Sequence, residues 1–164
     1  MQKRTKKQEE KTAALCMDSP IGTLMIVQEG EAIKEILFEE KITDIVPIQS
    51  TQLLLCAQRQ LNEYFAGKRK IFSLPLALCG TPFQRKVWQQ LAEIPYGEMR
   101  SYGQIAQAVG NSKACRAVGA ANHCNPIPII IPCHRVVGAN GSLTGYAGEL
   151  WRKKWLLQLE QDSR

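Results

Sequence analysis

The sequence has no long hydrophobic run. Its longest apolar stretch, Ile127 to Pro132, falls far short of the roughly 20 residues that a membrane-spanning helix needs. Residues 1–11 are charged throughout and lack the apolar core of a secretory signal. These absences predict an intracellular protein without a membrane partner, located in the cytoplasm, or in the nucleus if the source is a eukaryote.

The chain also lacks the residue spacing of a structural zinc site. None of its six cysteines forms a Cys-x-x-Cys pair, and its only two histidines, His123 and His134, each lie next to a cysteine. Disulfide frameworks are typical of small secreted domains with poor cores, whereas 45% hydrophobic residues allow this chain an ordinary core. We therefore expect free thiols, no metal and no cofactor.

Positive charge is concentrated in the second half of the chain. The net charge is +6, and residues 83–164 hold ten Lys or Arg against five Asp or Glu. A basic half of the chain indicates a polyanionic partner, and nucleic acid is the first candidate. A charged surface kept for solubility would show the same excess, so charge alone leaves both interpretations open.

The first half has the pattern of a small α/β or α+β unit. Short apolar runs at 13–17, 24–27 and 33–38 are separated by turn signals and predict strands. From Ser50 the apolar spacing becomes helical and ends at Gly67, and alternation over 72–78 predicts a last extended segment. We expect a disordered basic tail at 1–11, a small α/β domain at 12–79 and a helical domain at 80–164.

The second half is predicted to be mostly helical. Thr81 and Ser101 each stand three positions before a Gln, which is the pattern of a capping box at a helix start. The helix after Ser101 and the next one, predicted over 113–122, are joined by a turn that contains Gly110. This arrangement looks like a helix-turn-helix, although two ordinary packed helices would give the same pattern.

The last helix is predicted from an apolar stripe near the end of the chain. Trp151, Trp155 and Leu159 recur at helical spacing, and Glu160 follows one position on.

One cysteine has neighbours suited to nucleophilic chemistry. Three prolines upstream predict a rigid, extended connection that delivers Cys133 to a fixed place. His134 can act as a base, and the charge of Arg135 favours a thiolate. Consecutive side chains on an extended backbone point apart, so a bridging water between Cys133 and His134 fits better than direct contact. Glu160 ranks slightly above Glu149 as the carboxylate that orients the imidazole.

The residues around this cysteine resemble a known family. The segment Pro132-Cys133-His134-Arg135-Val136 is similar to the active-site motif of the O6-alkylguanine-DNA alkyltransferases, also called methylated-DNA-protein-cysteine methyltransferases. The first half resembles the family only in size and strand-rich character, which implies a ribonuclease-H-like unit. Through the second half the similar segments are, in order, Thr81-Pro82-Phe83-Gln84, Ile94-Pro95-Tyr96-Gly97, Ser101-Tyr102-Gly103, Arg116-Ala117-Val118-Gly119, Asn125-Pro126, Thr144-Gly145-Tyr146 and Trp155-Leu156-Leu157.

The resemblance implies direct-reversal repair of DNA. The Cys133 thiolate would take the alkyl group of an O6-alkylguanine, with O4-alkylthymine a further candidate, and keep it as a thioether, so that one molecule repairs one lesion. The base would first be flipped out of the duplex. The implied partner is double-stranded DNA, bound by a monomer in the minor groove with little regard to sequence. Glu149 stands where a small residue is common, which leaves the preferred alkyl group open.

The resemblance also assigns roles to individual residues. His134 would deprotonate the thiol through water, Glu160 would orient His134, and Tyr102 would assist the departure of guanine. Arg116 would fill the space of the flipped base. The other implied positions are Ala117 and Gly119 as small residues that let the helix approach DNA, Asn125 as a brace of the turn before the cysteine, Lys113 and Arg135 as phosphate contacts, Pro128 and Tyr146 as walls for the alkyl group, and Cys133, Val136 and Ala147 as backbone contacts to guanine.

Three other functions compete with alkyl transfer. A non-catalytic alkyltransferase-like protein would lack the cysteine that is present here as Cys133. A cysteine hydrolase with a Cys-His-Glu set would not explain the arginine-bearing helix just before the nucleophile, and no oxyanion-hole signature is evident. A transcriptional regulator with a helix-turn-helix would need a further regulatory domain, for which 164 residues leave no room.

Overall fold

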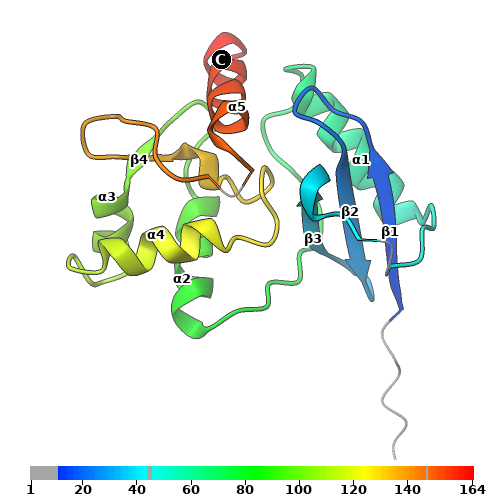
Figure 1. Cartoon of the computed structure of the whole chain (residues 1–164), viewed down its shortest axis with the longest axis horizontal. Coiled ribbons are helices and arrows are strands. Elements are labelled where there is room, and N and C mark those ends of the chain that lie inside the picture. Colours follow the sequence, from blue (N-terminus) through cyan, green and yellow to red (C-terminus); the bar gives the residue numbers. More distant parts are fainter. Residues whose placement is uncertain (1–10, 44–45, 147) are drawn as a thin grey trace, which may run out of the picture.

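The N-terminal half is a three-stranded sheet backed by one helix (Figure 1). The computed structural model describes residues 11–43, 46–146 and 148–164. Strands β1 (Thr12–Met17), β2 (Leu24–Glu29) and β3 (Ala32–Phe38) pair antiparallel in that order. A short 3-10 turn, η1 (Glu39–Lys41), follows β3, and helix α1 (Gln52–Phe65) packs on the sheet. These elements confirm the prediction for this half, while residues 1–10 of the predicted tail lie outside the described residues.

The outer edge of β3 is where the two halves of the chain meet. At one end Ile33 is bridged by the segment after α1, through hydrogen bonds from Ile33 N to Pro75 O and from Ala77 N to Ile33 O, both 2.8 Å long. Further along, Ile36 N donates to Pro126 O of the second half at 2.9 Å. The edge groups of β3 are therefore partly satisfied by both halves, and the predicted extended segment forms a bridge rather than a full strand.

The C-terminal half is mostly helical, as predicted. Both capping boxes are complete, since the Thr81 and Ser101 hydroxyls accept from backbone N–H groups that belong to Gln84 and Gln104, whose side chains accept in return. Helices α3 and α4 pack together as the expected helix-turn-helix. The elements are α2 (Pro82–Ala92), β4 (Arg100–Ser101), α3 (Tyr102–Ala108), α4 (Cys115–His123), η2 (Cys133–Arg135), β5 (Val136–Val137) and α5 (Leu150–Asp162).

Two local predictions are wrong in this half. Helix α4 begins at Cys115, because the turn after Gly110 continues to Ala114, which provides no side-chain cap. The segment before Cys133 is not extended along its length, since Ile131 N donates back to Ile127 O at 3.0 Å and closes a turn. Prolines exclude a helix interior there, but they do not prevent such a turn.

The predicted stripe of α5 is only partly buried. Trp155 and Leu159 pack against the core, whereas Trp151 is 48% exposed. The residues that α5 buries fully are Arg152, Lys153, Leu156 and Glu160, and apolar spacing did not predict that three of them are charged.

The described residues of both halves share one contiguous core. Ile33 and Leu54 of the first half belong to the same buried cluster as Val87, Cys133 and Leu156 of the second. Within the described part of the chain, the helices are too short or too polar to cross a membrane.

Candidate active site and DNA-binding face

Cys133 lies at the start of a tight turn in the core. Its side chain and backbone are only 2% exposed, and η2 is closed by a hydrogen bond from Arg135 N to Pro132 O at 3.0 Å. Immediately after the turn, β5 pairs in parallel with β4, with Val137 opposite Ser101. This pairing fixes the start of α3, and with it Tyr102, close to the cysteine segment.

The carboxylate of Glu160 is fully buried and accepts hydrogen bonds at both oxygens. Oε1 accepts from Arg135 Nε at 2.7 Å and from the backbone N–H of Gly97 at 3.1 Å. Oε2 accepts from the Tyr64 hydroxyl at 2.6 Å and from His134 Nε2. Burial would raise the pKa of Glu160, but the hydrogen bonds from His134 and Arg135, together with the charge of Arg135, outweigh burial and hold the pKa well below its ordinary value. Glu160 is therefore ionised.

This carboxylate determines which nitrogen of His134 carries the proton. An ionised carboxylate can only accept, so the proton of the neutral imidazole lies on Nε2. Nδ1 has no hydrogen-bond partner among the described residues and is left with its lone pair. Burial lowers the pKa of His134, against the opposing effect of Glu160, so the ring is neutral near pH 7. His134 is thus a base with a set tautomer.

The thiol of Cys133 is less acidic than an ordinary cysteine. Burial raises its pKa to about 11, although a hydrogen bond from Asn125 and the charge of Lys153 act in the opposite direction. The thiol is therefore protonated at neutral pH, and a nucleophile forms there only when a base removes the proton.

Asn122 and Asn125 hold the backbone around the cysteine. Asn125 Nδ2 donates to Ile131 O at 2.7 Å, and its Oδ1 accepts from Ile127 N at 3.0 Å. Asn122 Nδ2 donates to the carbonyl of Cys133 at 3.3 Å. Both asparagines stand at the end of α4 or just after it, so they connect the helix-turn-helix directly to the cysteine turn.

Lys153 is a buried residue that sequence reasoning missed. Its Nζ donates to the carbonyl oxygens of Val136 (2.5 Å) and Thr144 (2.9 Å). Burial lowers the pKa of Lys153 to about 8. The Val136 carbonyl was expected to bind guanine. Lys153 orients this carbonyl and occupies one of the two acceptor positions of its oxygen. The available signal was spacing: Lys153 lies seven positions before Glu160 on α5, so the two residues share a face of that helix.

Three further contributors to the network were also missed. They are the Tyr64 hydroxyl and the Gly97 N–H, which bind Glu160, and Asn122, which binds the Cys133 carbonyl. Tyr64 is 96 positions from Glu160, and no local pattern predicts such a contact.

Two sequence-predicted residues have different surroundings from those expected. Arg135 was expected to contact phosphate, but it is 6% exposed and donates to Glu160 and, at 2.7 Å, to Ile94 O, which contradicts that prediction. Glu149, the second candidate for orienting the imidazole, is exposed and instead accepts from Trp151 Nε1 at 3.1 Å.

The predicted walls of the alkyl pocket lie in the core near the cysteine. Tyr146 is 7% exposed and packs edge-on against Phe38 of the first half, with ring centroids 5.9 Å apart. Pro128 is buried and forms a bridge with Ile131. Ala147, expected to offer a backbone N–H to guanine, lies outside the described residues.

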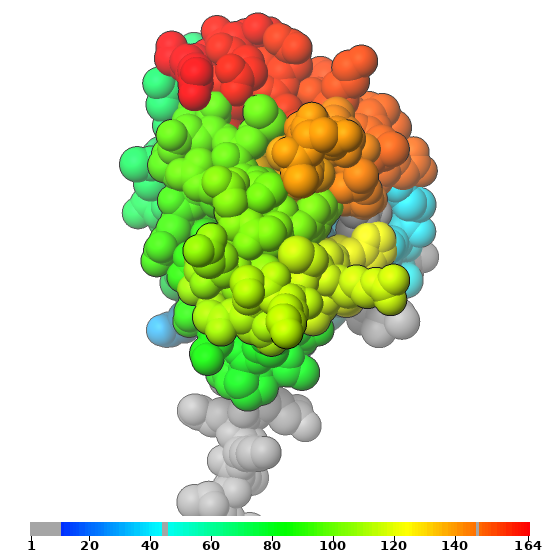
Figure 2. Space-filling view, turned by 90° about the vertical axis from the view of Figure 1, so that its left-hand side faces the viewer, coloured from blue at the N-terminus to red at the C-terminus, as the bar shows by residue number. Residues whose placement is uncertain are grey.

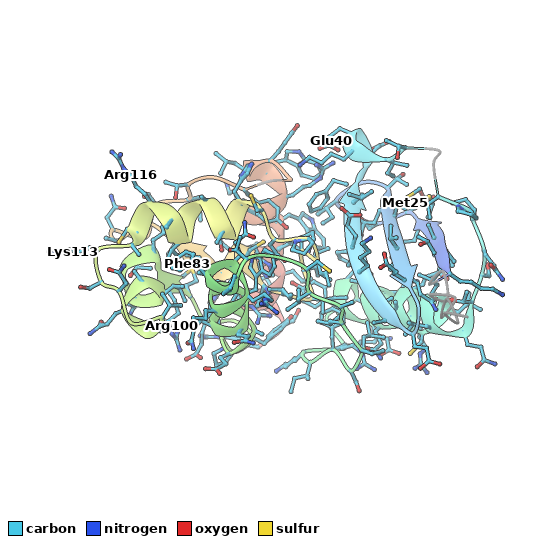
Figure 3. All side chains as sticks on the ribbon, turned by 90° about the horizontal axis from the view of Figure 1, so that it is seen from below. Met25, Glu40, Phe83, Arg100, Lys113 and Arg116 are labelled. Carbon is cyan, nitrogen blue, oxygen red and sulfur yellow. The ribbon has the colours of Figure 1, made fainter. Side chains whose placement is uncertain are left out.

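Helix α4 presents an open face beside this site. Arg116, Ala117 and Lys113 are exposed, whereas Val118 is buried on the opposite side of the helix. Figure 3 shows Arg116 and Lys113 projecting away from the body of the molecule. Figure 2 shows α4 on the same face as the loop that follows β5.

Tyr102 lies between α4 and this loop. Its hydroxyl is 3.3 Å from Thr144 Oγ1, and a Cβ added at Gly119 would lie 3.9 Å from its ring. An alanine at position 119 would thus make an ordinary van der Waals contact with Tyr102.

The fold and the site together define a class of protein: a DNA-binding helix-turn-helix joined to a buried cysteine, histidine and glutamate. Family models agree, since residues 15–78 match "6-O-methylguanine DNA methyltransferase, ribonuclease-like domain" and residues 82–162 match the "DNA binding domain" of the same family. The chain belongs to the 6-O-methylguanine DNA methyltransferase family.

Individual relatives agree over nearly the whole chain. It is 51% identical over 147 residues to a methylated-DNA–protein-cysteine methyltransferase of Methanosarcina acetivorans, covering 87% of this chain and 94% of the relative. The constitutive enzyme of Bacillus subtilis is 50% identical over 154 residues, covering 89% and 93%. The crystal structure of Mycobacterium tuberculosis OGT in complex with DNA superimposes with a TM-score of 0.86 at 46% identity, covering 92% of this chain and 94% of that one.

Proposed function

We propose that this chain repairs DNA by moving an alkyl group from the O6 atom of guanine to Sγ of Cys133. Family membership supports alkyl transfer from DNA to a protein cysteine. The observation that carries the assignment to Cys133 is the adjacent His134, which is neutral, fixed by Glu160 through Nε2 and unpartnered at Nδ1.

The reaction begins with removal of the thiol proton. The proton passes from Cys133 through a water to Nδ1 of His134, whose positive charge Glu160 then stabilises. The thiolate attacks the alkyl carbon, the new S–C bond forms as the C–O6 bond breaks, and the electron pair leaves on guanine. A hydrogen bond from the Tyr102 hydroxyl to N3 of guanine stabilises that charge, and guanine then takes up a proton. The thioether has no return path, so each molecule acts once.

DNA is bound through the exposed face of α4. Arg116 enters the stack from the minor groove and occupies the place of the flipped base, while Lys113 contacts phosphate. Ala117 and Gly119 are small residues, which let α4 approach the DNA closely. Such contacts are largely independent of base sequence and weaken with salt. A monomer suffices, because every residue of the proposed mechanism comes from one chain.

The flipped guanine occupies the space next to Cys133. The carbonyls of Val136 and Cys133 accept from its exocyclic amine, and Ala147 donates its backbone N–H to O6. Pro128 and Tyr146 enclose the alkyl group, and Asn125 maintains the turn that holds them. O4-alkylthymine is a second substrate for the same space.

We keep the division into a tail at 1–11, a domain at 12–79 and a domain at 80–164, and an intracellular location, as predictions.

The test uses a DNA duplex with a single O6-methylguanine whose methyl group is radiolabelled. Incubation with the protein should move the label to the chain, and peptide mass analysis should place one methyl group on Cys133, up to one equivalent. Cys133→Ser should leave the label on DNA, while Cys124→Ser, which changes an exposed thiol, should transfer it normally. Release of labelled methanol or turnover beyond one equivalent would contradict the proposal.

A further inference from the structure

A second buried charge lies one residue from Lys153 and has no part in the mechanism above. Arg152 is 4% exposed and sits in the first turn of α5. Its Nε donates to Ile21 O at 2.7 Å, in the turn between β1 and β2, and its Nη1 donates to Gly148 O at 2.9 Å. Both Nη atoms bind the carboxylate of Glu40 on η1. One guanidinium thus joins α5 and the loop before it to the N-terminal sheet.

Aromatic rings lie near this guanidinium as well. The Cζ atom of Arg152 is 4.8 Å from the centroid of the Phe38 ring and 5.0 Å from the centroid of the Trp151 ring. Fork-shaped hydrogen bonding and stacking are properties of arginine that lysine lacks. The contact with Phe38 brings Arg152 to the last residue of β3, and Figure 3 shows Glu40 at the boundary between the two halves.

Phe38 in turn contacts Tyr146, one of the two residues expected to enclose the alkyl group. It meets Tyr146 edge-on, at an interplanar angle of 66°. A Cβ added at Gly148 would lie 2.6 Å from the Phe38 ring, so no side chain fits between them. The position of the corner formed by β3 and η1 therefore sets the position of Tyr146 and Gly148.

We propose that Arg152 is a positioning residue for alkyl transfer: by fixing Phe38 and Gly148 it sets the distance between the Tyr146 wall and Cys133. The N-terminal sheet then contributes to the rate of transfer and to the size of alkyl group accepted. This inference rests on the proposed function, because it takes Tyr146 as a wall of the alkyl pocket.

The test compares Arg152→Lys and Glu40→Gln with wild type in single-turnover reactions. One substrate is a duplex with O6-methylguanine and the other is the free base O6-benzylguanine. Both substitutions should lower the limiting rate by about tenfold, within the range that small misplacements of reacting groups produce, and leave DNA affinity unchanged. They should also change the ratio of benzyl to methyl transfer by more than twofold, which a loss of stability alone would not do.

Glu63→Gln is the matched control. It breaks an ion pair with Arg69 (2.8 Å) within the N-terminal half, and neither residue forms a hydrogen bond or ion pair with the described part of the loop before α5. It should change neither rate. Glu40 is 44% exposed at its side chain, so the Gln variant is expected to fold even if an Arg152 variant does not. Wild-type rates and an unchanged ratio in folded Glu40→Gln would overturn the inference. Failure of the proposed function would be distinct, because the wild-type protein itself would then transfer no alkyl group.

Discussion

At the scale of single residues, the decisive property is the protonation of Cys133 and His134. A thiol with a pKa of about 11 is almost fully protonated at neutral pH, and the adjacent neutral imidazole of His134 has a free nitrogen that can accept its proton. The Cys133 thiol stays protonated until its proton passes to a base. Because a thiol is a much weaker nucleophile than a thiolate, this protonation protects the sulfur from unwanted reactions.

This arrangement predicts a pH-dependent defect for His134→Ala. At pH 7 its alkylation by O6-benzylguanine should be about 10²- to 10⁴-fold slower than wild type, the usual contribution of a general base. The gap should narrow as pH rises toward 11, because hydroxide then removes the thiol proton directly. Rates measured between pH 6 and 10 test this, with the exposed His123→Ala as control. A gap that is constant with pH would mean that His134 is only structural.

Arg116→Ala should separate base flipping from chemistry. Transfer from duplex O6-methylguanine should fall at least tenfold, because flipping costs a few kcal/mol and the arginine offsets part of it. Transfer from free O6-benzylguanine should stay within twofold of wild type, since no flipping is needed. Arg85→Ala, an exposed arginine on α2, is the control. Equal losses on both substrates would refute the assigned role.

The residue types at the site could be predicted from the sequence, but their long-range contacts could not. Cys133 and His134 are adjacent, and the motif around them is local. Arg135 was predicted to face phosphate, because nothing nearby reveals that its partner is Glu160, 25 positions away. Lys153 was missed because its partners are the backbone carbonyls of Val136 and Thr144, and a sequence motif does not show which side chain a backbone carbonyl binds.

At the scale of elements, the local rules worked where the signal lies within one helical turn. Capping boxes at α2 and α3 are of this kind, and both formed as predicted. The Trp and Leu stripe of α5 marks its buried face only in part, because Trp155 and Leu159 pack against the core while Trp151 is exposed. Arg152 and Lys153 are buried as well, since distant acceptors satisfy their charges.

The two capping boxes provide a matched pair of variants. Ser101→Ala and Thr81→Ala should each lower the free energy of unfolding by about 1 kcal/mol, the usual value for a lost N-cap. Only Ser101→Ala should also slow transfer from duplex DNA, because the first residue of α3 is Tyr102. Denaturant unfolding and single-turnover rates measure the two effects. Equal rates for both variants would remove Tyr102 from the mechanism or show that its position does not depend on the cap.

At the scale of the whole molecule, the shared core links the chemistry to stability. The folded state raises the pKa of Cys133 from 9.0 to about 11, so it binds more protons than the unfolded chain between these values. The stabilisation from this group is fully present below pH 9 and is lost as pH rises through 11. Lys153 acts in the opposite direction, because its folded-state pKa falls from 10.5 to about 8 and stability rises with pH between these values.

Cys133→Ser isolates the thiol contribution. Between pH 9 and 10.5 the unfolding free energy of wild type should fall relative to that of the serine variant, by at most about 1.4 kcal/mol per pH unit. Urea unfolding at several pH values measures this, and Cys124→Ser, at an exposed position, should follow wild type. A difference between Cys133→Ser and wild type that does not vary with pH would show that the thiol titrates alike in both states.

The hydrogen bonds to Glu160 also have a consequence for biosynthesis. Its partners are Tyr64, Gly97, His134 and Arg135, and all of them leave the ribosome before it does, Tyr64 by 96 positions. A nascent chain that stalls before α5 therefore carries the sulfur but has no carboxylate to complete its proton acceptor. Completion of the proton acceptor thus waits until the final helix is made, and a product truncated before α5 has no Glu160 to fix the tautomer of His134.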